Sequence, residues 1–206
     1  MKQKPLYRRT IIAVAKSNPT QLRFTNNSNS ESSVSFTGLS ADIRYKLNGT
    51  GGYTQWDGST ITLQPGEIVE MVGDNATRIS VSSQHFEIDG QLAASGSVMS
   101  LVSSSKIIKT IPQVDGYFAY LFYGCTGLTA APELPATALA NDCYGAMFSG
   151  CTGLTSIEVS FEEWLDGATY DWVDGVAASG TFTCPAALPE ELGSSYIPED
   201  WTIVTK

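Results

Sequence analysis

A nine-residue block that occurs twice constrains the fold of this chain more than any other feature. Leu121–Thr129 and Met147–Thr155 share seven identical positions and lie 26 residues apart. Units that repeat with a period of roughly 20 to 50 residues bury their apolar faces by stacking on their neighbours. Residues 103–206 are therefore expected to form a short solenoid that ends in a capping segment.

The repeat also predicts which residues build the core of this array. Equivalent positions of stacked units meet the same neighbours, so the shared apolar residues should pack in columns. Cys125 and Cys151 occupy the same repeat position, and stacked units about 4.8 Å apart would allow a disulfide between them. Small buried cysteines are the commoner outcome, so free thiols are expected. The predicted core residues are Leu121, Phe122, Cys125, Leu128, Met147, Phe148, Cys151 and Leu154.

Residues 34–102 follow a different pattern, with apolar residues at every second position. Ile43, Tyr45 and Leu47 alternate with other residues and lead into the glycine-rich stretch Asn48–Gly52. Turn signals of this kind recur about every 8 to 12 residues, which is typical of a small antiparallel β-sandwich or barrel. The chain as a whole is therefore expected to be mainly β.

The N-terminal segment is set apart by its charge. Half of the twelve Lys and Arg lie in residues 1–24, whereas all 21 Asp and Glu follow them. A polar stretch, residues 25–33, is expected to link this basic arm to the sandwich. The arm is expected to anchor the protein to an acidic partner, and Ile11–Val14 could add an edge strand to that partner. The predicted anchor residues are Lys2, Lys4, Arg8, Arg9, Lys16 and Arg23.

This boundary leads to an expectation about truncation. If the arm is separate from the body, deleting residues 1–24 should leave a folded protein that no longer joins its partner. The body is acidic, with a sequence pI near 4.5, and this opposes nucleic-acid binding. No run approaches the roughly 18 apolar residues of a membrane span, and no cleavable signal peptide is expected.

Catalytic, metal and cofactor motifs are not expected in this chain. His85 is the single histidine, and no base, nucleophile or metal-ligand pattern surrounds it. The acidic residues between Glu158 and Asp174 lack the alternating ligand order of a calcium loop, and a solvated face is the simpler interpretation. A carboxylate pair for glycoside hydrolysis is not visible in sequence, because its separation depends on the fold.

Aromatic residues near the turns and in the cap offer two interpretations. They could stack on sugars or anchor a protein partner, or they could pack in the core and cap. The candidate ligand-facing aromatics are Tyr53, Trp56, Tyr123, Tyr170 and Trp172.

The motifs resemble one family over residues 34–206. Phe148–Thr155, together with Ala131–Thr137 and Cys143-Tyr144, resembles the BspA-like leucine-rich-repeat surface proteins of gut and oral anaerobes. The closing segment, Trp172–Phe182 with Ile197–Trp201, looks like the cap of such arrays. The preceding β module is similar to one often placed before them, through Tyr45–Gly49, Trp56, Ile61–Gly66, Gly73–Asn75 and Gly96–Leu101.

The resemblance implies a binding or adhesive role, and similar modules are carried by tailed phages of the same bacteria. The short array and the expected lack of an export signal favour the phage setting, with the protein made in the host cytoplasm and incorporated in the virion. Expected partners are other virion proteins, contacted through the arm, and a host surface glycan or protein. Several copies, or a homo-oligomer, are expected in the assembly. The alternatives are a bacterial cell-surface adhesin whose leader was removed, and a carbohydrate-active enzyme.

Overall fold

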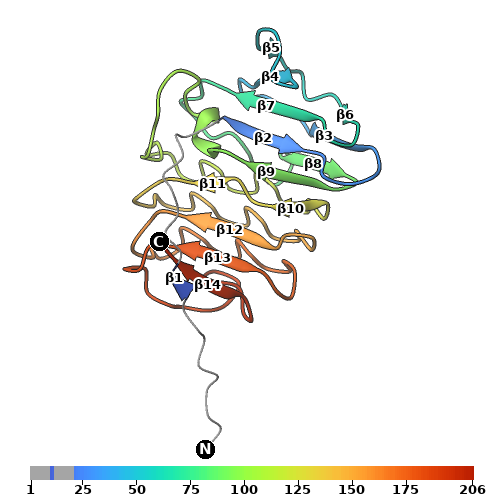
Figure 1. The fold of residues 1–206 in the computed structure, drawn as a ribbon. Coiled ribbons are helices and arrows are strands. Elements are labelled where there is room, and N and C mark those ends of the chain that lie inside the picture. The colour runs from blue at the N-terminus through green and yellow to red at the C-terminus, as the bar shows by residue number, and fades with distance from the viewer. Residues whose placement is uncertain (1–9, 12–20) are drawn as a thin grey trace, which may run out of the picture.

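The fold is mainly β, as the sequence predicts. The computed structural model describes the backbone of residues 10–11 and all of residues 21–206. Figure 1 shows how the elements are arranged. The elements are β1 (Thr10–Ile11), β2 (Leu22–Thr25), β3 (Ser32–Phe36), β4 (Arg44–Leu47), β5 (Thr54–Gln55), β6 (Ile61–Leu63), β7 (Ile68–Val72), β8 (Phe86–Asp89), β9 (Leu92–Ser95), the 3₁₀ helix η1 (Val98–Leu101), β10 (Leu128–Ala130), β11 (Glu133–Leu134), β12 (Ser156–Val159), β13 (Thr181–Cys184) and β14 (Thr202–Thr205).

The strands form three sheets. A six-stranded sheet has the order β10-β9-β2-β7-β4-β5, and a three-stranded sheet has the order β6-β3-β8. A five-stranded sheet, β1-β14-β13-β12-β11, contains parallel pairs. The first half of the chain is thus largely antiparallel, and the second half adds its strands one after another in the same direction (Figure 1).

The antiparallel strands of the first half enclose an aromatic core. Phe24 on β2 lies edge-on to Phe86 on β8, with ring centroids 5.2 Å apart. Phe36 on β3 and Trp56 pack on the same Phe86 ring, at 4.9 and 6.1 Å. The six-stranded and three-stranded sheets are therefore joined by rings that alternate along their strands, as the period of two predicts.

Strand β2 shows that the predicted boundary between the N-terminal arm and the body is wrong. The expected arm ends at residue 24, but β2 lies between β7 and β9 in the six-stranded sheet. The side chains of Leu22 and Phe24 are completely buried. The expected linker also contributes to the core, since buried Asn26 donates from its amide to the carbonyl oxygens of Ser30 and Leu63, both at 2.8 Å. The body of the protein therefore begins by Leu22.

Successive repeat units pair through their main chains in the second half. The amide of Phe118 donates to the carbonyl of Cys143 at 3.0 Å, and that of Phe122 donates to Met147 at 3.0 Å. One unit later, Phe148 donates to Trp172 at 2.8 Å. These bonds join turn segments of successive units, so the units are held together outside the paired strands as well.

A column of rings runs through the units and into the first half of the chain. Phe86 stacks on Phe122 at 5.3 Å and 11°, and Phe122 stacks on Phe148 at 5.6 Å and 7°. Trp172 continues the column, 6.1 Å from Phe148. All eight core residues predicted from the repeat are at most 2% exposed. The two halves thus share one continuous hydrophobic core.

The turn segments return to a left-handed backbone conformation every four residues. Positive φ angles occur at Gly116, Tyr120 and Gly124, and again at Asp142, Ala146 and Gly150. The last positions of the two series, Gly124 and Gly150, lie close together, since a Cβ built on Gly150 would be 3.3 Å from the Cα of Gly124. Glycine suits this last position because it is free of both the φ penalty and the clash.

Cys125, Cys143 and Cys151 are buried thiols that form no disulfide, as expected, and Cys184 is buried as well. The Cys125 thiol donates to the carbonyl oxygen of Phe86, and the Cys151 thiol donates to that of Phe122, both at 3.0 Å. Burial raises the pKa of Cys151 to about 12. Each repeated cysteine thus joins its unit to the preceding one as an uncharged donor, and a disulfide is not needed.

Replacing Tyr144 by Phe is expected to leave stability unchanged or to raise it by up to about 2 kcal/mol, because a buried hydroxyl without a partner carries a desolvation penalty. Tyr144 is completely buried between Phe118 and Trp172, and its hydroxyl makes no hydrogen bond. Urea unfolding of the two proteins measures the change.

Tyr117→Phe is the matched control for Tyr144→Phe. The Tyr117 hydroxyl donates to the carbonyl oxygen of Asn75, so its removal should cost about 1 kcal/mol. Equal losses for both variants would show that the Tyr144 hydroxyl has a stabilising partner.

Candidate binding surfaces

Two of the five aromatics proposed from the sequence belong to the core. Trp56 is 4% exposed, and its indole N–H donates to the carbonyl oxygen of Ser59 at 2.9 Å. Trp172 is completely buried, and its N–H donates to Tyr196 at 2.7 Å. Their rings pack inside the protein, and each indole N–H already donates to a backbone carbonyl, so neither of these residues faces a ligand.

Tyr53 is half-buried and interacts within its own sheet. The Lys46 ammonium lies 4.9 Å from the centre of the Tyr53 ring, and it also pairs with Glu70 at 2.8 Å. Burial raises the pKa of the Tyr53 hydroxyl. This ring is held by a cation–π contact. Tyr53 directly precedes β5, which lies at the end of the six-stranded sheet opposite β10 and thus apart from the repeat units.

The remaining two aromatics are exposed and belong to one cluster. Tyr123 is 42% exposed and Tyr170 is 66% exposed. Tyr120 lies between them, with its ring 5.6 Å from that of Tyr123 and close enough to Tyr170 for their hydroxyls to interact electrostatically. His85 adds a fourth ring, 5.9 Å from Tyr123. We call these four residues the tyrosine ridge.

The repeat architecture positions the tyrosine ridge. Tyr120 donates its amide to Gly145 at 2.9 Å, and Ala146 donates to Tyr170 at 2.8 Å, so three successive units are in register there. The middle unit carries only Gly145 and Ala146 at this place. The ridge tyrosines thus come from the two outer units, and their backbone is hydrogen-bonded across units.

Two members of this ridge, Tyr120 and His85, are not among the aromatics predicted from the sequence. Tyr120 precedes the repeated block by one residue and corresponds to Ala146 in the next unit, so an apolar-to-aromatic change at a repeat position was the available signal. His85 had no such signal. It lies beside Tyr123 because Phe86, the next residue, accepts a hydrogen bond from Cys125 in the following unit.

A second surface is a hollow on the face of the parallel strands. It has a volume of about 250 Å³ and is lined by Ala94, Ser95, Gly96, Ala130, Ala131, Glu133, Ser156, Ile157, Glu158 and Thr183. Glu133 and Glu158 are direct neighbours across β11 and β12, and Glu158 pairs with Lys206 at 2.5 Å. Burial and the charge of Glu158 raise the pKa of Glu133.

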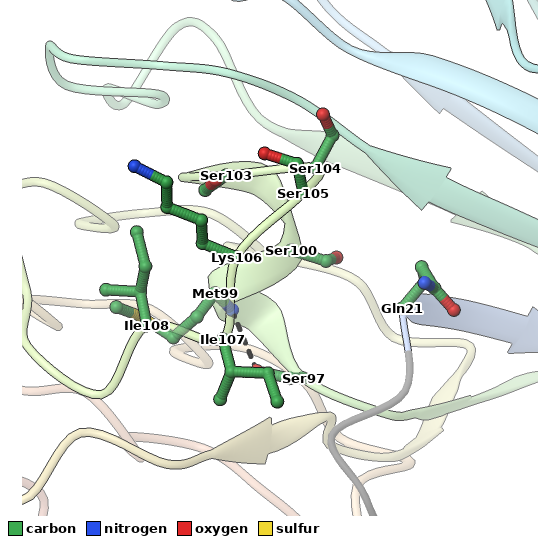
Figure 2. A pocket seen from close by; sticks show the side chains of 10 residues that line it. All are labelled: Gln21, Ser97, Met99, Ser100, Ser103, Ser104, Ser105, Lys106, Ile107 and Ile108. Atoms are coloured by element: carbon green, nitrogen blue, oxygen red, sulfur yellow. Dashed lines mark hydrogen bonds between the residues drawn. The ribbon is translucent and has the colours of Figure 1, made fainter.

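A third hollow, of about 140 Å³, lies beside η1 and is shown in Figure 2. Five serines line it, and three of them, Ser97, Ser100 and Ser104, use their hydroxyls in hydrogen bonds within the protein. Ser97 caps η1 by accepting from the amide of Met99 at 3.2 Å. Ser100 accepts from the amide of Leu22 and donates to the carbonyl of Met71. This hollow is thus the joint between η1 and the six-stranded sheet.

The loop that borders this hollow is held by Asp74, whose pKa falls to about 2 because the amide and hydroxyl of Ser104 and the Arg44 guanidinium bind its carboxylate. We expect an NMR titration of the Asp74 carboxyl to give a midpoint near 2. A depressed pKa stabilises the fold at pH values above the ordinary 3.8, and that stabilisation is lost as the pH falls toward 2.

Ser104→Ala tests the cause of this shift, since it removes the hydroxyl donor and should return the midpoint toward 3.8. A wild-type midpoint at 3.8 would contradict the loop contacts.

The charged anchor proposed for the N-terminus is described only at its last member. Lys2, Lys4, Arg8, Arg9 and Lys16 lie outside the described residues. Arg23 lies on β2, where its guanidinium pairs with Glu70. Burial opposes the ionisation of Glu70, but hydrogen bonds from Lys46 and Arg23 outweigh it and lower its pKa. Arg23 therefore neutralises a buried carboxylate of its own sheet.

Within the part of the chain that the structure describes, three or more His, Cys, Asp or Glu side chains do not gather where they could hold a metal ion. His85 contacts the Phe86 carbonyl through Nδ1 at 3.0 Å. None of the helices in the described ranges has the length and hydropathy needed to cross a membrane.

Comparison with protein-family models, curated proteins and solved structures finds no match to this chain.

Proposed function

We propose that this protein is a non-enzymatic, adhesive component of a phage virion, which binds a host surface glycan through the tyrosine ridge. The observation that carries this proposal is the gathering of the exposed Tyr123 and Tyr170 around the half-buried Tyr120, whereas large aromatics nearby, such as Phe122, are buried. Exposed tyrosines placed side by side are typical of binding surfaces, because they offer a large contact area and lose little conformational entropy.

The chemistry of the ridge favours a sugar. The negative face of an aromatic ring attracts the C–H groups on the apolar face of a pyranose, and the phenol oxygens exchange hydrogen bonds with its hydroxyls. Asp171 adds an acceptor beside Tyr170, and its negative charge raises the pKa of the Tyr170 hydroxyl. Tyr170 thus remains a neutral donor next to a carboxylate.

The fold proposed to carry this ridge is a leucine-rich-repeat-like solenoid with a capping segment. Its support is the 26-residue repeat, the main-chain pairing of successive units and the resemblance to the BspA-like family. The same resemblance supports the phage setting, because tailed phages of the host bacteria carry similar modules. Attachment to other virion proteins is assigned to the N-terminal segment.

Binding to a panel of host cell-wall and capsular polysaccharides tests the ridge. The combined variant Tyr120→Ser, Tyr123→Ser, Tyr170→Ser should lose at least about tenfold in affinity, since stacking contacts of this size are worth 1 kcal/mol or more each. Tyr53→Ser is the matched control and should bind normally. Unchanged glycan binding by the triple variant would overturn the assignment of the ridge.

The location and the non-enzymatic character have separate tests. Mass spectrometry of purified particles should detect the protein in the virion, whereas detection only in the cell envelope would favour a bacterial surface adhesin. Polysaccharide turnover that a single Asp or Glu substitution abolishes would establish an enzyme instead.

A further inference from the structure

Two places on the turn segments carry tyrosines in one repeat unit and aspartates two units later. One place, marked by a positive φ, is held in three successive units by Tyr120, Ala146 and Asp171. The place three residues later is held by Tyr123, Ser149 and Asp174. Main-chain bonds keep the units aligned here, since Gly124 donates to Ser149 and Gly150 donates to Asp174, both at 2.8 Å. A pair of phenols is thus followed, in line, by a pair of carboxylates.

The two pairs lie close enough for one ligand to contact both. Two inter-unit steps of about 4.8 Å place them about 10 Å apart. Tyr170 connects them, because its hydroxyl interacts electrostatically with the Asp171 carboxylate and with the hydroxyl of Tyr120. The rings of the tyrosine ridge and the aspartates therefore belong to one surface.

Both carboxylates are available to a ligand. Asp174 is exposed, and Asp171 is half-buried. The Ser194 hydroxyl donates to the Asp171 carboxylate at 2.8 Å, which positions it beside Tyr170. Neither aspartate forms an ion pair with any residue that the structure describes. A cation from outside the protein would therefore not have to displace one of these side chains.

The charges around the ridge favour a positively charged ligand. Residues 110–205 contain thirteen Asp and Glu and no Lys, Arg or His. The first half of the chain adds His85 beside Tyr123, and it adds Arg78, whose guanidinium donates to the Asp115 carbonyl and interacts with the Asp142 carboxylate. A surface that is negative overall attracts cations and repels acidic polysaccharides. The faces of aromatic rings also attract ammonium groups.

We propose that the tyrosine ridge, together with Asp171 and Asp174, selects a glycan whose sugars carry free, protonated amino groups. The sugar rings stack on the tyrosines, and the ammonium groups pair with the two carboxylates. An N-acetylated amino sugar has the same ring without the charge, so it binds through the ring contacts alone. This inference rests on the proposed glycan-binding role of the ridge and adds the chemical class of the glycan.

Calorimetric titration of the full chain with two oligosaccharides of equal length tests the selection. One is an oligomer of glucosamine, at a pH at which its amines are protonated, and the other is the matching oligomer of N-acetylglucosamine. We expect the glucosamine oligomer to bind at least about fivefold more tightly, since a single exposed charge pair contributes up to about that factor. This preference should shrink as salt is added, because exposed charges are screened.

The double variant Asp171→Asn, Asp174→Asn should bind the two oligomers equally, with its affinity for the acetylated one unchanged. Asparagine tolerates the positive φ at position 171 and keeps an oxygen that accepts from Ser194, so the fold is retained. Glu162→Gln, Glu163→Gln is the matched control. It removes two exposed carboxylates that lie between β12 and the turn segment, and it should leave the preference intact.

Three results would each overturn this inference: no binding of the glucosamine oligomer, equal binding of both oligomers by the unchanged protein, or a preference that survives in the double aspartate variant. If the triple tyrosine variant loses polysaccharide binding in any of these cases, the glycan-binding role of the ridge stands without the amine selection. Binding of the glucosamine oligomer that the three tyrosine substitutions leave unchanged would overturn both proposals.

Discussion

Phe122→Ala should reduce the free energy of unfolding by about 3 to 5 kcal/mol, because it opens a cavity in a closed part of the core. Phe122 is completely buried, and its ring contacts Phe24, Phe86 and Phe148 at 6.1, 5.3 and 5.6 Å. These neighbours come from the antiparallel half and from the next repeat unit. Urea unfolding followed by tryptophan fluorescence and by circular dichroism measures the loss.

Phe122 contacts rings from both halves of the chain, so its unfolding transition also tests whether the halves unfold together. Because the halves have one core, both probes should follow a single transition in the wild type and shift together in the variant. Phe122→Leu, which keeps most of the volume, should cost less than about 1.5 kcal/mol, and the exposed neighbour Tyr123→Ala should cost about 0.5 kcal/mol or less. A change of under 1 kcal/mol for Phe122→Ala, or two separate transitions, would show that the halves fold apart.

Deleting residues 1–24 should prevent folding, whereas deleting residues 1–20 should leave a folded protein. The longer deletion removes the central strand β2 with its buried Leu22 and Phe24, and it splits β7 from β9. It also removes Arg23 and leaves Glu70, which is 6% exposed, with Lys46 as its remaining partner. Circular dichroism and amide NMR spectra distinguish the two outcomes.

Leu22→Ala and Phe24→Ala in the full chain separate the effect of the strand from that of the deletion. Each should lose about 2 to 5 kcal/mol, since both side chains are completely buried. A folded, stable protein that lacks residues 1–24 would support the boundary expected from charge and would contradict the role of β2.

How far the sequence predicts this fold depends on whether the signal is local. The repeated block identified eight core positions, because residues at the same place in stacked units meet the same surroundings. Alternation predicted the β strands of the first half. Leu22 and Phe24 also alternate, but four residues in a basic context give a weak signal, and their burial is decided by β7 and β9, which lie far away in sequence.

The candidate site shows the same limit. Tyr123 and Tyr170 lie near turns, where a ligand-facing position is predicted, and both side chains are exposed. Trp172 also lies near a turn, but it is buried. It follows the positive-φ residue Asp171, just as Met147 follows the positive-φ residue Ala146. The offset between Met147 and Trp172 is one residue shorter than the offset of 26 in the repeated block. That single-residue change hid its equivalence to a core position. Tyr120 joins the ridge through contacts between units, which a reading of one unit does not show.

The register of the units also bears on how proteins of this kind change over generations. Successive units contact one another through main-chain bonds and through the ring and thiol columns. Recombination between the two near-identical nine-residue blocks would insert or remove one whole unit and leave all neighbouring contacts intact. The molecule would lengthen or shorten in steps of about 4.8 Å. Such changes would move the ridge tyrosines apart or together while the ends of the protein stayed the same, so that ligand preference could vary without a new fold.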